Sequence, residues 1–272
     1  MQDDAPVPTL ESITAAFEAV SFEQLLHHFT TCHEPFVVLS GVSVDLFNAY
    51  FEDDEEAPFR LRFVDLVDGD VIITDVASCA HETVIGNFEY AFLQATGDGD
   101  EVNSSGSFTA SRGQGIKMMQ ADATYGPFYN TLNRGPPPTL DEGPPRVLRR
   151  CSEWVTLAVV VGHYQTWTGL EAAGNWWSHY VGVKYVLLMK VNENASTLAY
   201  KLFEISQVGD LPLPSQQGSL TVDDDMKQYI LRIDTRHLLA IPHGDEIPSG
   251  MHDVCAVDLG RVLRQAHRSC HN

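Results

Sequence analysis

The stretch Trp154-Val155-Thr156-Leu157-Ala158-Val159-Val160-Val161-Gly162 sets the architecture expected of this chain. Residues 155–161 are almost wholly apolar and rich in β-branched side chains, a composition typical of a strand covered on both faces. A second run of this kind spans 183–191. The segment between the two runs predicts a helix with one apolar face, formed by Leu170, Ala173, Trp177 and Tyr180. Strand, helix and strand in this order predict a right-handed parallel crossover and therefore an α/β fold.

The residues before this crossover predict antiparallel strands and another helix. Phe59-Arg60-Leu61-Arg62-Phe63 alternates with the period of two of a half-buried strand, and 70–74 forms its partner after a tight turn at Asp68-Gly69. A helix then begins at 78–80 and ends before Gly97. Its apolar stripe consists of Val84, Ile85, Phe88, Ala91, Phe92 and Ala95.

The remaining segments complete the expected organisation. Alternation over 196–205 predicts an edge strand. Beyond it we expect a strand at 229–233 and a helix over 254–266. We therefore predict three parts: a helical lead-in with an acidic linker over 1–57, a core over 58–205, and a C-terminal extension over 206–272 that packs on the core. Within the lead-in, Ser21 and Gln24 form a capping box for a short helix.

The charge of the chain limits its partners. With 272 residues, the chain is long enough to bury a substantial core. Lys and Arg number 17 against 37 Asp and Glu, which gives a formal net charge of −20. This balance works against tight binding of nucleic-acid backbones, although a local basic groove remains open as an interpretation. Candidates for that groove are Arg60, Arg62, Arg112, Lys117, Arg146, Arg149 and Arg150.

Cysteine content and hydropathy bear on location. The five cysteines are scattered and odd in number, so no disulfide framework follows from them. We expect no secretory signal and no membrane-spanning segment, because the first residues are acidic and no apolar run is long enough. An intracellular location, cytoplasmic or nuclear, is the expectation.

Several weak motifs occur in a recognisable order. The hairpin over 64–71 followed by His81-Glu82 resembles the start of the Uma-type family of restriction-endonuclease-like proteins, within the PD-(D/E)XK superfamily. Ala121-Asp122-Ala123 is similar to that family's Pro-Asp-Xaa strand. Residues 154–157 and 162–166 resemble the Trp-Pro-Thr-Leu and Gly-Tyr-Ser-Gln segments of its fungal-type members, and 183–188 matches the strand after their helix. The resemblance spans 59–205, about half of the chain.

The resemblance implies a restriction-endonuclease-like mixed sheet flanked by helices, and a metal-dependent nuclease site. Phosphodiester hydrolysis there requires one or two hard cations, Mg²⁺ above all, held by oxygen ligands. Carried over residue by residue, the metal ligands are Glu82 on the helix and Asp122 on the strand, and Gln165 completes the catalytic set. The third acid falls on Val160, whose side chain has no lone pair. The strand lysine is also absent, because Gly162 occupies its place.

Each of these residues also has a structural interpretation. Glu82 is favourable in the first turn of a helix through the helix dipole alone. Asp122 precedes Gly126-Pro127 and is equally suited to a turn, and Gln165 to bonding backbone at a strand end. His81 lies on the apolar stripe of its helix, where a hydrogen-bonded core histidine is the commoner role than a catalytic base.

Two functions therefore follow from the sequence. The first is a catalytically degenerate relative with weak or lost phosphodiesterase activity, which acts as a binding or scaffold module for a protein partner or a second copy of itself. It needs no cofactor. The second is an active Mg²⁺-dependent nuclease on DNA or RNA that uses Glu82, Asp122 and Gln165. Resemblance of fold does not choose between them.

Overall fold

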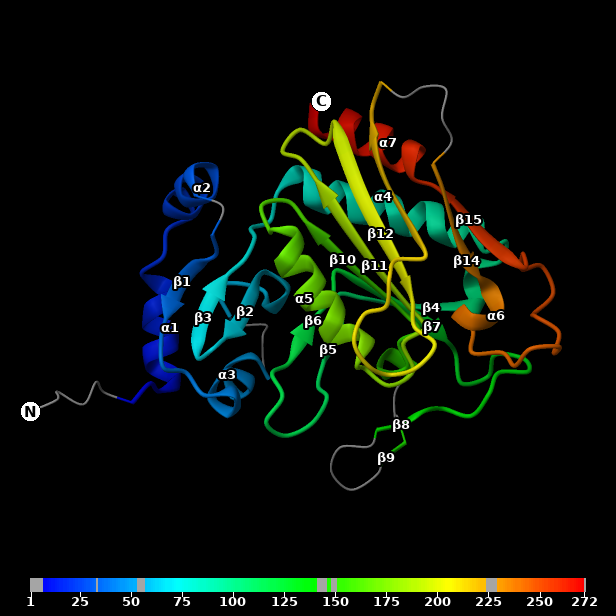
Figure 1. Ribbon diagram of the computed structural model, residues 1–272, viewed down its shortest axis with the longest axis horizontal. Helices are drawn as coiled ribbons and strands as arrows, with labels where there is room; N and C mark the ends of the chain where they lie inside the picture. Colours follow the sequence, from blue (N-terminus) through cyan, green and yellow to red (C-terminus); the bar gives the residue numbers. More distant parts are fainter. Residues whose placement is uncertain are drawn as a thin grey trace, which may run out of the picture. The chain divides into compact units, whose positions relative to one another are not determined.

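The computed structural model describes residues 7–32, 34–52, 57–140, 146–147, 151–223 and 229–271 (Figure 1). Two compact units share the chain. The first consists of Met1–Val76, Thr109–Gln120 and Tyr164–Thr166, and the second of Ala77–Phe108, Ala121–His163 and Trp167–Asn272. Residues of the predicted core, 58–205, contribute to both units. The predicted division at 57/58 and 205/206 stays a prediction about organisation along the sequence.

The first unit packs three helices and short strands around an aromatic core. A three-stranded antiparallel sheet has the order β1-β3-β2. The elements are α1 (Leu10–Glu18), α2 (Phe22–Thr31), β1 (Phe36–Leu39), α3 (Val44–Phe51), the 3₁₀ turn η2 (Leu61–Phe63), β2 (Val64–Val67), β3 (Asp70–Ile73), β5 (Thr109–Ala110) and β6 (Met119–Gln120). The capping box of Ser21 and Gln24 is present at the start of α2. Ile13, Phe17, Phe47 and Phe51 are buried at the centre.

The predicted hairpin is correct in its turn and wrong in its first strand. Asp68 and Gly69 adopt positive φ angles of 51° and 86°, as a tight two-residue turn requires. Residues 61–63 form a 3₁₀ turn instead of a strand, and pairing starts at Val64. Phe63 and Val64 are both buried, so the period of two breaks between them, and the Phe63 N–H donates locally to the Arg60 carbonyl at 2.9 Å.

The second unit is built on a six-stranded mixed sheet with the order β13-β12-β11-β10-β7-β4. Its strands are β4 (Val102–Gly106), β7 (Ala123–Pro127), β10 (Leu157–Gly162), β11 (Tyr185–Val191), β12 (Thr197–Glu204) and β13 (Gln216–Thr221). Its other elements are α4 (Cys79–Ala95), η3 (Gly99–Glu101), β8 (Thr139–Leu140), β9 (Arg146–Val147), η4 (Cys151–Glu153), α5 (Trp167–Ser178), β14 (Ile230–Asp234), α6 (Thr235–Leu238), β15 (Val254–Asp258) and α7 (Leu259–His271).

The predicted parallel crossover is confirmed. β10 and β11 pair in parallel and in register from Leu157 opposite Tyr185 to Gly162 opposite Lys190, and α5 connects them. The other neighbours in this sheet pair antiparallel. The α/β class, with a mixed sheet flanked by helices, therefore holds.

Helices cover both faces of this sheet (Figure 1). The side chains of Leu157, Val159 and Val161 belong to one buried cluster with residues of α4 and α7. On the opposite face, α5 packs closely enough that a Cβ at Gly174 would lie 3.2 Å from Leu188. Such two-sided burial explains the unbroken apolar sequence of β10.

Two predictions near the C-terminus are wrong. β12 is not an edge strand, because β13 pairs along its outer side. The segment of β13, Gln-Gln-Gly-Ser-Leu-Thr, is too polar to indicate a strand by composition. The predicted helix over 254–266 begins only at Leu259, since 254–258 alternates between exposed and buried side chains and pairs with β14.

No helix among the described residues combines the length and the apolar character needed to cross a membrane.

Two glycines of the second unit provide a matched test of backbone approach. A Cβ at Gly126, in β7, would collide with the carbonyl oxygen of Trp154, whereas a Cβ at the exposed Gly86, within α4, would meet nothing within 4 Å. We expect Gly126→Ala to lower the free energy of unfolding by about 1–3 kcal/mol through overpacking. Gly86→Ala should raise it by about 0.5–1 kcal/mol through helix propensity. Urea denaturation measures both values, and equal effects of the two substitutions would contradict the described packing.

Candidate functional site

A fully buried histidine joins the two acids predicted as metal ligands. His81 lies in the first turn of α4, and its side chain is 0% exposed. Its Nδ1 is 3.2 Å from Oε1 of Glu82, and its Nε2 is 3.1 Å from Oδ1 of Asp122. Nε2 also lies 3.1 Å from the carbonyl oxygen of Val161 in β10. The structure therefore brings Glu82 and Asp122 to opposite nitrogens of one imidazole ring.

Local sequence explains why His81 occupies this place. The Ser78 side chain caps α4 by accepting the His81 N–H at 3.1 Å, which fixes the start of the helix. His81 is then positioned on the same buried stripe as Val84, Ile85 and Phe88. The ring consequently reaches the sheet, while Glu82, one residue on, keeps a side chain that is 45% exposed.

Asp122 stands where the β7–β10 ladder ends. The register stops at Ala123 opposite Val159, and the Asp122 N–H donates to the Val159 carbonyl at 3.0 Å. Its Oδ2 accepts the backbone N–H of Val161 at 2.7 Å. Both carboxylate oxygens thus have close neighbours on His81 and Val161, and the side chain is only 2% exposed. Asp122 therefore connects β7, β10 and α4, and we call its contacts with His81 and Val161 the clasp.

The hydrogen-bonding role of the His81 ring follows from its neighbours. Nε2 faces a backbone carbonyl and a carboxylate, both of which only accept hydrogen bonds, so this nitrogen carries a hydrogen. Nδ1 faces the carboxylate of Glu82, also an acceptor when ionised. At Nε2 the ring is therefore placed to donate a hydrogen bond.

The place of the third acid is apolar. Val160 is 6% exposed and adjoins Val161, which contacts Asp122. Gly162 follows at the end of β10. Neither side chain supplies an oxygen or a nitrogen at this end of the strand.

Gln165 lies in the other compact unit, and it stays a predicted site residue. Its backbone N–H is 3.5 Å from Oδ2 of Asp75, and the Tyr164 N–H is 3.3 Å from Oδ1 of the same carboxylate. Asp75 is 1% exposed and also accepts the N–H of Val76 at 2.8 Å. Sequence analysis did not single out this buried acid, since a lone Asp after a strand resembles an ordinary turn residue.

The side chains at His81 do not suit a hard divalent cation. Mg²⁺ prefers several oxygen ligands arranged around one point. Here the two carboxylates are separated by an imidazole, and Asp122 already accepts a backbone N–H. Across the described residues, no group of three or more His, Cys, Asp or Glu side chains could hold a metal ion.

The predicted basic groove is partly engaged in the protein's own contacts. In the first unit, Lys117 pairs with Asp65 and donates to the Leu66 carbonyl at 3.0 Å. The guanidinium of Arg62 lies 4.7 Å from the ring centre of Phe63. Arg149 and Arg150, and the side chain of Arg146, lie outside the described residues.

Replacing His81 tests the clasp. We expect His81→Phe, which keeps a ring of similar size, to lower the free energy of unfolding by about 3–5 kcal/mol, because the buried Asp122 carboxylate would lose the imidazole nitrogen that faces it. Glu82→Gln should cost less than about 1 kcal/mol, because its side chain is half exposed. Both values come from denaturant titration. Similar small losses in the two variants would show that His81 does not hold Asp122.

Comparisons with known proteins add a structural similarity. No protein-family profile and no curated protein match the sequence. The chain is similar to the crystal structure of a proposed nuclease belonging to DUF820 from Anabaena variabilis ATCC 29413, with a TM-score of 0.44 and 9% sequence identity. The match covers 82% of this chain and 99% of that one. At this sequence identity, the role of a residue in that protein cannot be assigned to a residue of this chain.

Proposed function

We propose that the chain is a divergent relative of the PD-(D/E)XK nucleases, of the Uma type and similar to its fungal-type members, in which metal-dependent phosphodiester hydrolysis is weak or lost. It acts as a binding or scaffold module. The proposal rests on the order of motifs along 59–205 and above all on the clasp that Asp122 forms with His81 and Val161.

The clasp supports loss of hydrolysis for a chemical reason. A metal-dependent nuclease needs carboxylates that are free to bind a cation which polarises phosphate and activates water. Asp122 is 2% exposed, and its oxygens face His81 and the Val161 N–H. Binding a cation would require breaking the hydrogen bond from Val161 and separating Asp122 from His81 within the core. Val160 adds no ligand that would compensate.

The binding role follows from the charge of the chain. A net charge of −20 disfavours a long nucleic-acid backbone, and Lys117 of the candidate groove is paired with Asp65. A protein partner suits the acidic composition better, and a second copy of this chain is the other candidate protein partner. Nucleic acid bound through a local basic groove is the competing partner.

The alternative, an active Mg²⁺-dependent nuclease on DNA or RNA, is favoured by one observation. The Glu82 side chain is 45% exposed, so a cation would reach this carboxylate without disturbing the core. In that case Glu82, Asp122 and Gln165 would form the catalytic set, with Glu82 and Asp122 as the metal ligands.

A metal titration separates the two functions. We expect Mg²⁺ and Mn²⁺ at millimolar concentration to leave the melting temperature unchanged, because a ligand stabilises a protein only if it binds the folded state. We also expect no cleavage of single- or double-stranded DNA or RNA. A metal-dependent rise in Tm that Asp122→Asn abolishes, together with cleavage, would establish the nuclease instead.

Val160→Glu serves as the restoring variant. If the alignment of Val160 with the missing acid is right, this substitution should create a Mn²⁺-dependent rise in Tm that the parent lacks. Circular dichroism shows whether the variant folds, and Val160→Gln is the uncharged control of equal length. A folded Val160→Glu protein that ignores metal would show that the register of the resemblance is wrong.

A further inference from the structure

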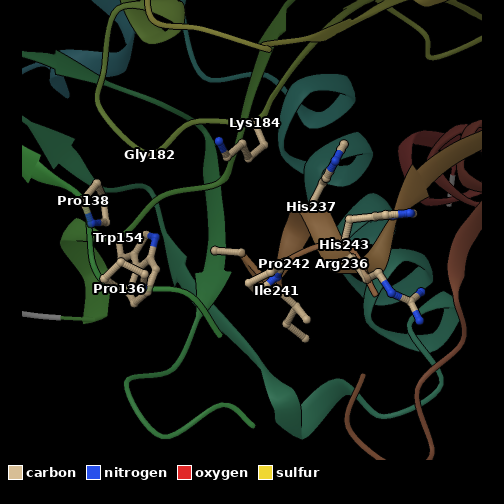
Figure 2. Close-up of a pocket in the computed structure, with 11 residues that line it drawn as sticks. Pro136, Pro138, Trp154, Gly182, Lys184, Arg236, His237, Ile241, Pro242 and His243 are labelled. Carbon is tan, nitrogen blue, oxygen red and sulfur yellow. The ribbon is translucent and has the colours of Figure 1, made fainter. Parts of the chain in front are cut away.

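A pocket of about 360 Å³ lies in the second unit (Figure 2). Its lining does not include His81, Asp122 or Val161. Three segments line it: Pro136 and Pro138, Gly182 and Lys184, and the stretch from Arg236 to His243, together with Trp154. We propose that this pocket binds a small organic phosphate that carries a ring, of the size of a mononucleotide. The inference does not depend on whether the chain hydrolyses phosphodiesters.

One wall of the pocket is apolar and rigid. Trp154 is 2% exposed, and the guanidinium of Arg134 lies 5.0 Å from its ring centre. Arg134 is itself fixed, since its Nε donates to the Tyr129 carbonyl and its Nη1 to the Gly135 carbonyl, each at 2.8 Å. A preformed wall of this kind suits a flat apolar body, because little entropy is lost in ordering it.

A glycine keeps this wall open. Gly182 has a φ of +96°, and a Cβ there would lie 2.9 Å from Cγ of Pro138 and 3.6 Å from Cδ1 of Trp154. Any side chain at this position would therefore press on the residues that form the wall. Pro136, Pro138 and Pro242, which are exposed or half-buried, provide the accessible apolar surface typical of small-molecule sites, and the buried Trp154 and Ile241 back it.

Lys184 provides the positive charge. Its backbone is anchored, because its N–H donates to the Thr156 carbonyl at 2.8 Å. Its side chain is half buried, and no carboxylate among the described residues lies within ion-pair distance of its Nζ. In Figure 2 the amine points toward the side of the pocket where Trp154 and Pro138 lie. A half-buried ammonium with no carboxylate partner in the described part of a chain that has 20 more acidic than basic residues indicates an anionic ligand.

The other nitrogen-bearing side chains of the pocket differ in availability. Arg236 is occupied by Asp253, at 2.9 Å, and in Figure 2 its guanidinium extends away from Trp154. His237 lies with Nδ1 3.3 Å from Glu204, and it keeps a side chain that is half exposed. His243 is exposed at the rim. Lys184 is thus the main contact for an anion, and the two imidazoles add hydrogen-bond donors.

The lining favours a phosphate ester over a neutral ligand. Among the residues that the structure describes, no Asp or Glu side chain lines the pocket. Lysine binds phosphate as a point charge, and imidazole N–H groups donate to its further oxygens. The volume lies within the range of about 300–1,000 Å³ common for ligand pockets, which leaves room for a ring beside the phosphate.

Calorimetric titration tests this inference, with AMP as the probe and with adenosine and inorganic phosphate as its two halves. We expect AMP to bind more tightly than either half. Lys184→Gln, which keeps the length of the side chain and removes the charge, should weaken AMP binding roughly tenfold or more, as expected for loss of a charge-assisted hydrogen bond. Adenosine binding should be unaffected by the same substitution.

Lys201→Gln is the matched control, because Lys201 is also partly exposed but pairs with Glu171 at 2.6 Å and lies outside the pocket. Its AMP affinity should equal that of the parent. The inference is overturned if AMP gives no binding at millimolar concentration, or if Lys184→Gln and the parent bind AMP equally. Equal affinity for AMP and inorganic phosphate would overturn the role of the apolar wall. Equal affinity for AMP and adenosine would overturn the role of the Lys184 charge.

Discussion

The contact of His81 with Asp122 and Val161 is the constraint on which the centre of the second unit depends. It ties the first turn of α4 to the point where β7 and β10 part. The His81 ring contacts both the buried Asp122 carboxylate and the backbone of β10. A buried carboxylate is tolerated only with a partner. The same contact occupies the Asp122 carboxylate, and the proposed loss of metal-dependent hydrolysis rests on this contact.

Local patterns predicted the elements whose environment is uniform. The crossover of β10, α5 and β11 was predictable, since burial on both faces leaves an unbroken apolar run and α5 a clear stripe. The errors lie where distant partners decide the outcome. Polar β13 covers the edge of β12, and β15 is a strand because β14 pairs with it. A window of a few residues contains no information about such partners.

The candidate site was predictable only in part for the same reason. Sequence indicated Glu82 and Asp122 through their motifs and placed His81 on a buried stripe. That one imidazole contacts both acids depends on a pairing across some forty residues, which no spacing rule contains. Lys184 went unnoticed because a single lysine beside a covered strand carries no pattern. Lys184 becomes a candidate ligand contact because folding places it in one pocket with Trp154 and Ile241.

The interleaving of the two compact units has a consequence for how this protein can change over time. The chain passes from one unit to the other at 76/77, 108/109, 120/121, 163/164 and 166/167. No single cut in the polypeptide releases either unit whole, and no contiguous piece of a gene encodes one of them. Recombination therefore cannot exchange one unit for a foreign module, and the two must be inherited together.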